Sequence, residues 1–255
     1  PQVKILNRKH KNDITVDVSE RLWSALGTAV HTMFEDYATG DYLSEERLFT
    51  EVNGWKISGA IDIQKAEQDG TVSILDYKCT SVWSVIFGKS SWEQQLNFYA
   101  WLVQKCKGLQ VSKLQILAVL RDWKQSDADF KSDYPKQPIT TVDIPLWSSS
   151  QQEDFVRKRV ELHQQAEIDY LNGNPIAECT AEETWTRQTK FAVMKKGRKK
   201  AIKLFDNEAD ALNRVESLGS GHYVEKRQGE AVRCERYCTA AMFCPQYQRG
   251  KNAGN

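Results

Sequence analysis

The chain has 255 residues, with 35 Lys and Arg against 34 Asp and Glu and a formal net charge of +1. This balance excludes a uniformly basic, histone-like protein, and no apolar run approaches the roughly 20 residues that a membrane span requires. With 40% hydrophobic and 27% charged residues, the composition predicts a water-soluble globular protein without membrane contact. The N-terminal stretch lacks the apolar run of a secretory signal, which predicts an intracellular protein.

The first half of the chain predicts a helix followed by three antiparallel strands. Ser19 is a candidate N-cap for a helix whose apolar residues from Leu22 to Tyr37 recur at helical spacing, and Gly40 follows it. Asn53 and Gly54 then form the pair that best adopts the positive φ angles of a tight hairpin. The strands are expected at residues 47–53, 55–65 and 71–78.

The rest of the chain predicts further α/β structure and then a separate module. The patterns favour a helix at 90–107, strands at 113–120 and 139–144, and a long helix at 149–171. The sequence Asn-Gly-Asn-Pro at 172–175 is a strong breaker. We therefore predict a first domain at residues 1–174 and a small module at 175–255. Within the module, a basic hairpin and a short helix are expected at 190–205 and 208–218.

Two acidic residues and a lysine fall on neighbouring predicted strands. Side chains of a strand alternate between its two faces, so Asp76 and Lys78 share one face, and Asp62 on the preceding strand can join them. Paired carboxylates make the oxygen-rich site that Mg²⁺ or Mn²⁺ prefers. A lysine beside them can activate water or stabilise charge on a phosphate, so the combination predicts metal-dependent phosphodiester hydrolysis.

Three further side chains are candidates for the same site. His31, on the first predicted helix, can supply an imidazole ligand, which suits Mn²⁺ better than Mg²⁺. Gln95 and Tyr99 are four residues apart on one helix and share a face, where Gln95 can hold Lys78 and Tyr99 can contact a phosphate. Each signal is weak alone, because a single histidine on a helix is commonly structural. The prediction rests on the ordered set.

These motifs resemble the PD-(D/E)XK nuclease superfamily, and specifically its RecB-like branch, which includes AddB nuclease domains, CRISPR-adaptation exonucleases and phage exonucleases. The resemblance covers about residues 19–120. Four motifs of the branch match this chain. Gly-x-x-x-His matches Gly27 and His31, and Gly-x-x-Asp matches Gly59 and Asp62. Asp-x-Lys matches Asp76 and Lys78, and Gln-x-x-x-Tyr matches Gln95 and Tyr99. It implies an α/β fold with a restriction-endonuclease-like α-β-β-β-α-β core. It also implies DNA cleavage with Asp62, Asp76, Lys78, Gln95 and Tyr99 as catalytic residues.

The resemblance further implies a set of metal ligands. The backbone carbonyl of Tyr77 is expected to bind the ion together with His31, Asp62 and Asp76. Some members of the family have an additional upstream glutamate, which corresponds here to Glu46. Glu45 and Glu51 lie close to Glu46 in the sequence, so that match is loose.

The six cysteines fall into two groups. Cys79 and Cys106 stand apart and are expected in the core, whereas Cys234, Cys238 and Cys244 cluster near the end, a pattern that favours a metal site in an intracellular protein. Several RecB-like nucleases close a four-cysteine site with a C-terminal Cys-x-x-Cys-x5-Cys motif. The present spacing has one extra residue, and Cys179 is the best fourth ligand. A [4Fe-4S] cluster, a structural Zn²⁺ and buried free thiols are the three alternatives.

A basic run in the predicted module is a candidate DNA-binding surface. From residue 186 to 203 the chain carries eight lysines and arginines and no acidic residue. The residues expected to contact phosphates are Lys195, Lys196, Arg198, Lys199 and Lys200. A merely solvated face is the other interpretation of such a run.

Together these observations predict a Mg²⁺- or Mn²⁺-dependent DNA exonuclease of phage or bacterial recombination, repair or replication. It would act in the cytoplasm of a bacterial or phage-infected cell, with a recombination or replication protein as a possible partner. An endonuclease with the same chemistry is the nearest alternative. A non-catalytic DNA-binding module and a hydrolase acting on RNA are the others.

Overall fold

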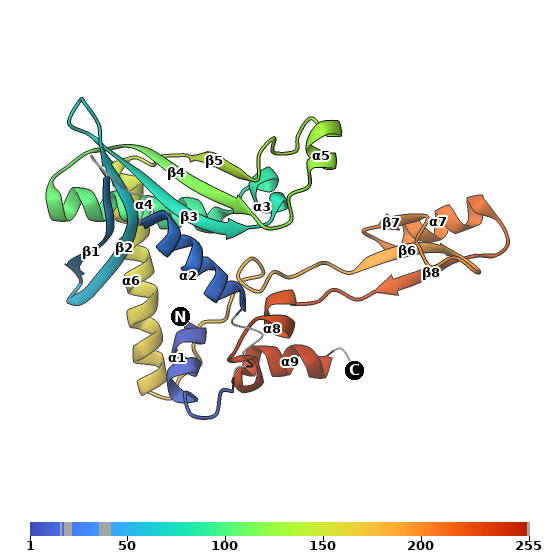
Figure 1. Ribbon diagram of the computed structural model, residues 1–255. Helices are drawn as coiled ribbons and strands as arrows, with labels where there is room; N and C mark the ends of the chain where they lie inside the picture. Colours follow the sequence, from blue (N-terminus) through green and yellow to red (C-terminus); the bar gives the residue numbers. More distant parts are fainter. Residues whose placement is uncertain (16, 18–21, 36–41, 254–255) are drawn as a thin grey trace. The chain divides into compact units, whose positions relative to one another are not determined.

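The computed structural model describes residues 1–15, 17, 22–35 and 42–253. The chain forms two compact units, residues 16–165 and residues 1–15 with 166–255, whose elements are labelled in Figure 1. The first fifteen residues join the second unit because Leu6 packs against Ala240 and Cys244. This division differs from the predicted one, in which residues 1–174 form the first domain.

The larger unit contains a five-stranded sheet in the order β1-β2-β3-β4-β5. Its strands are β1 Tyr42–Val52, β2 Trp55–Ala66, β3 Val72–Thr80, β4 Val111–Leu120 and β5 Ile139–Ile144. β3 and β4 are parallel, and every other neighbouring pair is antiparallel. The parallel pair requires a crossover, which the helices between β3 and β4 provide.

The predicted hairpin between β1 and β2 is present. Asn53 and Gly54 have φ angles of 48° and 76°, so both adopt the left-handed region that a two-residue hairpin turn requires. The turn fixes the register in which Val52 pairs with Trp55 and Leu48 pairs with Gly59. The positions of the acidic residues on β1 and β2 follow from this register.

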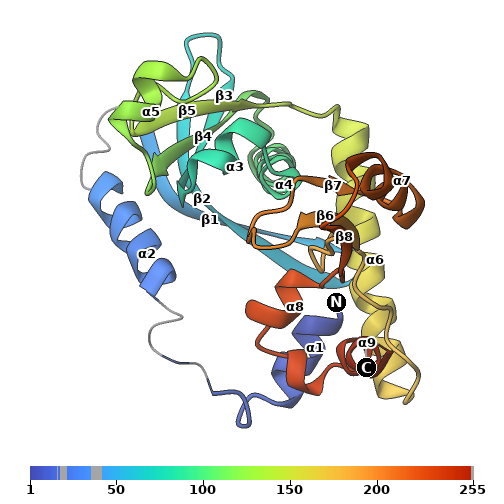
Figure 2. The ribbon, with the colours of Figure 1, turned by 90° about the vertical axis from the view of Figure 1, so that its right-hand side faces the viewer.

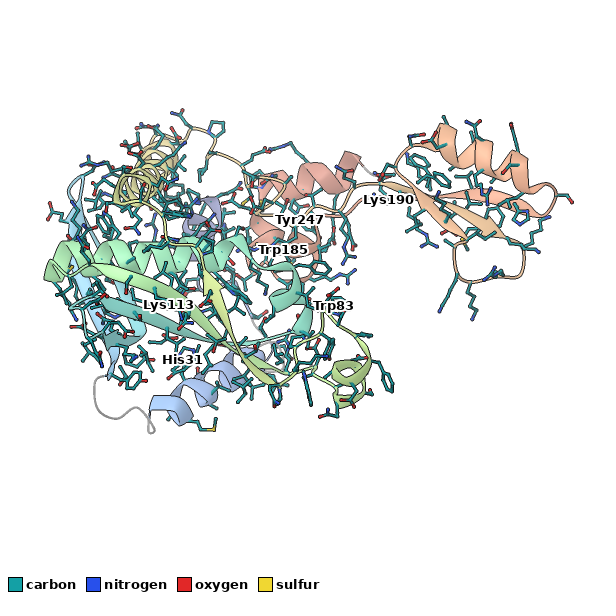
Figure 3. The ribbon with its side chains drawn as sticks, turned by 90° about the horizontal axis from the view of Figure 1, so that it is seen from above. His31, Trp83, Lys113, Trp185, Lys190 and Tyr247 are labelled. Atoms are coloured by element: carbon teal, nitrogen blue, oxygen red, sulfur yellow. The ribbon has the colours of Figure 1, made fainter. Side chains whose placement is uncertain are left out.

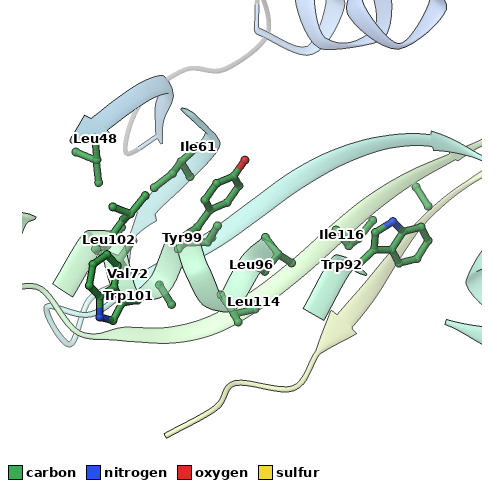
Figure 4. Packing of buried hydrophobic residues seen from close by; sticks show 14 of the residues in the cluster. Leu48, Ile61, Val72, Trp92, Leu96, Tyr99, Trp101, Leu102, Leu114 and Ile116 are labelled. Atoms are coloured by element: carbon green, nitrogen blue, oxygen red, sulfur yellow. The ribbon is translucent and has the colours of Figure 1, made fainter. Parts of the chain in front are cut away.

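Helices α2 and α4 cover opposite faces of this sheet (Figures 2 and 3). Helix α4, Ser90–Lys107, has the bounds that the sequence predicts and ends at Gly108 in the left-handed conformation. Its residues Leu96 and Leu102 are fully buried against the strands (Figure 4). This layer of helix on sheet is the hydrophobic core of the larger unit.

Helix α2, Leu22–Glu35, lies where the sequence places a helix, but its apolar stripe does not pack as expected. Val30 is buried, whereas Leu22, Leu26 and Met33 are exposed. The proposed N-cap Ser19, together with Tyr37 and Gly40, lies outside the described residues. Helix α2 approaches β3 through His31, whose ring meets Tyr77 edge-on with centroids 5.6 Å apart.

Gly59 is required by the close approach of α4 to β2. A Cβ atom at this position would lie 2.8 Å from Leu102 Cδ1 and 2.9 Å from Tyr99 Cε1, so a larger residue would displace the Tyr99 ring. A Cβ atom added to Gly27, the other glycine of the motifs, would meet no described atom within 4 Å. Of these two glycines, only Gly59 therefore has a steric role among the described residues.

The remaining helices of the larger unit are α3 Val82–Phe87, α5 Gln125–Phe130 and α6 Ser149–Leu171, which continues into the second unit. Helix α6 has the predicted bounds, whereas α3 and α5 were not predicted, because six residues are too few to show a helical period. None of the described helices combines the length and apolarity that crossing a membrane requires.

The second unit contains a small antiparallel sheet in the order β7-β6-β8 with helix α7. Strands β6 Lys190–Lys195 and β7 Lys203–Phe205 form the predicted basic hairpin, and α7 covers Glu208–Leu218 as expected. Strand β8, His222–Arg227, was not predicted. The unit also has helices α1 Gln2–Lys9, α8 Val232–Arg236 and α9 Pro245–Ala253, and the 3₁₀ helix η2 Ala241–Phe243.

Candidate metal centre

The candidate site lies where β2 and β3 separate. Their ladder ends at the pair Ile63 and Leu75, although β2 continues to pair with β1 and β3 with β4. The next residues in register are Asp62 and Asp76. Because the ladder has ended there, the backbone N–H of Tyr77 is available to Asp62 Oδ2, to which it donates a hydrogen bond of 2.8 Å.

Asp76 is enclosed by polar groups from its own strand and from α4. Gln95 Nε2 donates to Asp76 Oδ1 at 3.0 Å and to Tyr99 Oη at 2.8 Å, so the predicted i, i+4 pair shares one face as expected. Lys78 Nζ forms an ion pair with Asp76 Oδ2. In place of the predicted contact with Lys78, Gln95 binds the carboxylate of Asp76, which Lys78 also contacts.

Both aspartates are buried, with exposed fractions of 7% for Asp62 and 1% for Asp76. Burial, followed by the nearby charge of Asp76, raises the pKa of Asp62 to about 6. Burial also raises the pKa of Asp76, against the opposing effect of Lys78. Two carboxylates in a poorly solvated position resist ionising together, and a bound cation would favour the ionised form of both.

One oxygen of Asp76 is bound by a positive charge. Asp76 Oδ2 is buried, and among the described residues it forms an ion pair with the Lys78 ammonium. Buried carboxylate oxygens normally have hydrogen-bond partners or bind cations. The donor set therefore fits a hard divalent cation.

His31 and Glu45 extend this site on the side of α2. His31 Nδ1 lies 3.5 Å from Glu45 Oε1 and 3.6 Å from Asp62 Oδ2. In the described part of the chain, these three residues form the one group of histidine, cysteine or acidic side chains whose ligand atoms all lie within 4.8 Å of one another. Together with the nearby Asp76, they provide nitrogen and oxygen donors of the kind that Mn²⁺ and Mg²⁺ bind.

The structure places Glu45, and not Glu46, at this position. Glu46 Oε2 accepts a hydrogen bond of 2.7 Å from Gln64 and forms an ion pair with Lys107. Glu45 lies opposite Asp62 at a break in the β1–β2 ladder and has a φ angle of 50°. Adjacent residues of a strand point to different faces, so only one of the two glutamates can join the site. Sequence spacing alone did not distinguish them.

Tyr77 lies between Asp76 and Lys78, as the Asp-x-Lys motif requires. Its N–H is used by Asp62, and its side chain is buried beside His31. The role of its carbonyl as a metal ligand stays a prediction.

The four candidate cysteine ligands all belong to the second unit and form no disulfide. Burial raises the pKa of Cys234, and Cys238, Cys244 and Cys179 raise it further. The Cys179 N–H donates to the side-chain oxygen of Gln246 at 2.9 Å, and the side-chain nitrogen of Gln246 donates to the Cys179 carbonyl at 2.8 Å. These two bonds hold Cys179 against α9. No three of these sulfur atoms, all in the described chain, lie within 4.8 Å of one another.

The other two cysteines differ from expectation in one respect. Cys79 is half-buried, but Cys106 is exposed and is therefore not a core residue. Its thiol contacts the Phe49 carbonyl at 3.3 Å.

The predicted DNA-contacting residues occupy the exposed end of the β6–β7 hairpin. All five side chains are exposed, and Gly197 between them has a φ angle of 82°. Within the described structure none of the five forms a salt bridge with an acidic side chain, in contrast to Lys190, which pairs with Asp206.

Comparison with known proteins decides the family. The profile of the PD-(D/E)XK nuclease superfamily matches residues 41–245. The chain belongs to the PD-(D/E)XK nuclease superfamily. This membership confirms the predicted α/β fold with a PD-(D/E)XK core, and it implies phosphodiester hydrolysis in a nucleic-acid substrate.

Solved structures similar to this PD-(D/E)XK protein are distant. SSO0001 has a TM-score of 0.45 and 16% identity, covering 64% of this chain and 71% of its own. A Eubacterium rectale protein described as a candidate exonuclease has a TM-score of 0.34 and 13% identity, covering 66% of this chain. The present chain spans 61% of the length of that second protein. A search of curated proteins gave no significant match.

The two adjacent glutamates provide a matched test of the metal centre. We expect Glu45→Gln to weaken Mn²⁺ binding by roughly tenfold, because it removes a charged oxygen ligand, and Glu46→Gln to leave binding unchanged. Isothermal titration with MnCl₂ measures both. Equal Mn²⁺ affinities for the wild type and Glu45→Gln, or a larger loss in Glu46→Gln, would contradict this assignment.

Proposed function

We propose that this nuclease is a Mg²⁺- or Mn²⁺-dependent DNA exonuclease of the RecB-like branch. The catalytic residues are Asp62, Asp76, Lys78, Gln95 and Tyr99. The observation that carries the proposal is the buried pair Asp62 and Asp76, in which Asp62 lies beside His31 and Glu45 and Asp76 forms an ion pair with Lys78.

The metal ligands are expected to be His31, Asp62, Asp76 and the backbone carbonyl of Tyr77, with Glu45 replacing Glu46. A bound divalent cation lowers the pKa of a coordinated water and neutralises charge on the phosphate. The donor set supports this assignment, because a positive charge between two buried carboxylates stabilises the ionised form of both.

The protein's own groups orient the reaction around this centre. Gln95 donates both of its observed bonds through one amide nitrogen, so it fixes Asp76 and Tyr99 relative to each other. Lys78 is held against Asp76, where its ammonium group can orient the attacking water or stabilise charge on the phosphate. Burial raises the pKa of Tyr99, so its hydroxyl stays protonated and can donate to a phosphate oxygen.

The second unit supports DNA binding. The loop residues Lys195, Lys196, Arg198, Lys199 and Lys200 gather positive charge in one exposed turn, an arrangement that binds phosphates independently of sequence. The net charge of the chain is only +1, so such local sorting is needed to attract a polyanion. A role in bacterial or phage recombination, repair or replication, in the cytoplasm and with a protein of that system as partner, fits this chemistry.

The cysteines of the second unit are proposed to hold a [4Fe-4S] cluster, with structural Zn²⁺ as the alternative. Burial raises the pKa of Cys179 and Cys234, and neighbouring thiols raise both further, which supports a metal centre because metal ligation relieves the repulsion between thiolates. The preference for the cluster over zinc rests on the resemblance to RecB-like nucleases, because four thiolates can hold either centre.

A comparison of linear with closed circular DNA tests the proposed activity. With Mn²⁺, we expect the wild type to degrade end-labelled linear DNA and to leave closed circles intact, because an exonuclease needs an end. Asp76→Asn and Lys78→Met should each lose roughly 10²- to 10⁴-fold in rate while still binding DNA. Lys113→Met, which removes an exposed lysine elsewhere on the sheet, is the control (Figure 3).

The other results of this experiment each select an alternative function. Cleavage of circles selects the endonuclease, and degradation of RNA alone selects a ribonuclease. DNA binding by a wild type that cleaves no nucleic acid selects the non-catalytic module. Full activity of Lys78→Met would overturn the proposed catalytic set.

Anaerobic purification tests the cysteine centre. We expect a brown protein that contains iron and sulfide, with the colour lost in Cys238→Ser and retained in Cys106→Ser, since only the former removes a proposed ligand. Visible absorbance and elemental analysis give the answer. Colourless protein with about one zinc per chain would select the zinc site, and metal-free wild type with an ordered C-terminus would rule out both.

A further inference from the structure

Helix α3 presents two large aromatic side chains to solvent directly after the strand that carries Asp76 and Lys78. Trp83 is 57% exposed and Phe87 is 78% exposed. Their rings are nearly parallel, with an interplanar angle of 13° and centroids 5.7 Å apart. Figure 3 shows Trp83 at the edge of the larger unit.

Folding does not account for this pair. Helix α3 already packs through its other face, where Val82 is buried and Val85 and Ile86 contact the core. Trp83 and Phe87 are four residues apart and lie together on the remaining face. Two exposed aromatic rings on one short helix forgo the stabilisation that their burial would provide, so a role in binding is the better explanation.

This aromatic platform, Trp83 and Phe87, is held firmly next to the catalytic strand. The Val82 N–H donates to Asp122 Oδ1 at 2.8 Å, and the Arg121 N–H donates to the Thr80 carbonyl at 3.0 Å. These bonds join the start of α3 to the ends of β3 and β4, which run parallel. Trp83 therefore follows Lys78 by only five residues on a fixed backbone path.

Positive charge accompanies the aromatic pair. Lys89 follows Phe87 by two residues, and the Arg121 N–H is bonded to the carbonyl of Thr80, just before α3 begins. From residue 77 to 92 the chain contains no acidic residue. Phosphates passing α3 would thus meet cations beside exposed rings.

We propose that Trp83 and Phe87 stack against unpaired bases of the DNA strand being cleaved, while Lys89 and Arg121 contact its phosphates. Single-stranded DNA and frayed ends are then the preferred substrates. Stacked bases of an intact duplex cannot offer their faces to the rings, whereas unpaired bases can extend the Trp83–Phe87 stack. This inference deepens the proposed DNA exonuclease function and rests on it.

Binding measured without cleavage tests the platform. The variants are Trp83→Leu with Phe87→Leu, which keeps the surface apolar but removes stacking, and Trp83→Phe with Phe87→Tyr, which keeps two aromatic rings. Fluorescence anisotropy in EDTA compares labelled oligo(dT) with a blunt duplex of equal length, and the rate on both substrates is then measured with Mn²⁺.

We expect the leucine pair to bind oligo(dT) roughly tenfold more weakly, with little change for the duplex, and the aromatic pair to bind like the wild type. The preference for single-stranded over duplex DNA in kcat/KM should fall by the same factor. Equal losses on both DNAs, or leucine variants that bind oligo(dT) normally, would overturn the platform and leave the surface to a protein partner. A wild type that cleaves no DNA would instead overturn the proposed function.

Discussion

Two carboxylates buried together at the point where β2 and β3 separate are the constraint on which the site depends. Asp62 and Asp76 are almost inaccessible to water, and burial raises the pKa of both. In such surroundings ionisation is unfavourable unless a positive charge is present. Lys78 supplies one to Asp76, and the donor atoms of His31, Glu45 and Asp62 can bind a second.

Three local features of the fold create this arrangement. The β2–β3 ladder stops one residue before the aspartates, and the released Tyr77 N–H then binds Asp62. Gly59 lets α4 approach β2 closely enough for Tyr99 and Gln95 to reach the same place. Glu45 departs from the regular strand conformation beside His31. Irregular backbone of this kind is common at functional sites.

Much of this could be predicted from the sequence, because it depends on local spacing. The Asn53-Gly54 hairpin, helix α4 and the Gln95–Tyr99 pair each follow from a few neighbouring residues. Other features depend on contacts between distant segments. Whether Glu45 or Glu46 faces His31 depends on a break in the β1–β2 ladder, and strand β8 forms only because β6 offers an edge. The exposed pair on α3 likewise has no distinguishing signal until its packed face is known.

The buried site keeps Asp62 ionisable for a cation, and this lowers the stability of the metal-free protein. A folded pKa of about 6, above the ordinary 3.8, means that its contribution to stability is present below pH 3.8 and lost as the pH rises through 6. Melting temperatures of the wild type and Asp62→Asn, in EDTA and in Mn²⁺ at pH 7.5 and 5.0, test this. We expect Asp62→Asn to melt higher in EDTA at pH 7.5, with a smaller gap at pH 5.0, and to lose the stabilisation by Mn²⁺ seen in the wild type. A variant that melts lower than the wild type in EDTA at pH 7.5, or is stabilised equally by Mn²⁺, would contradict the account.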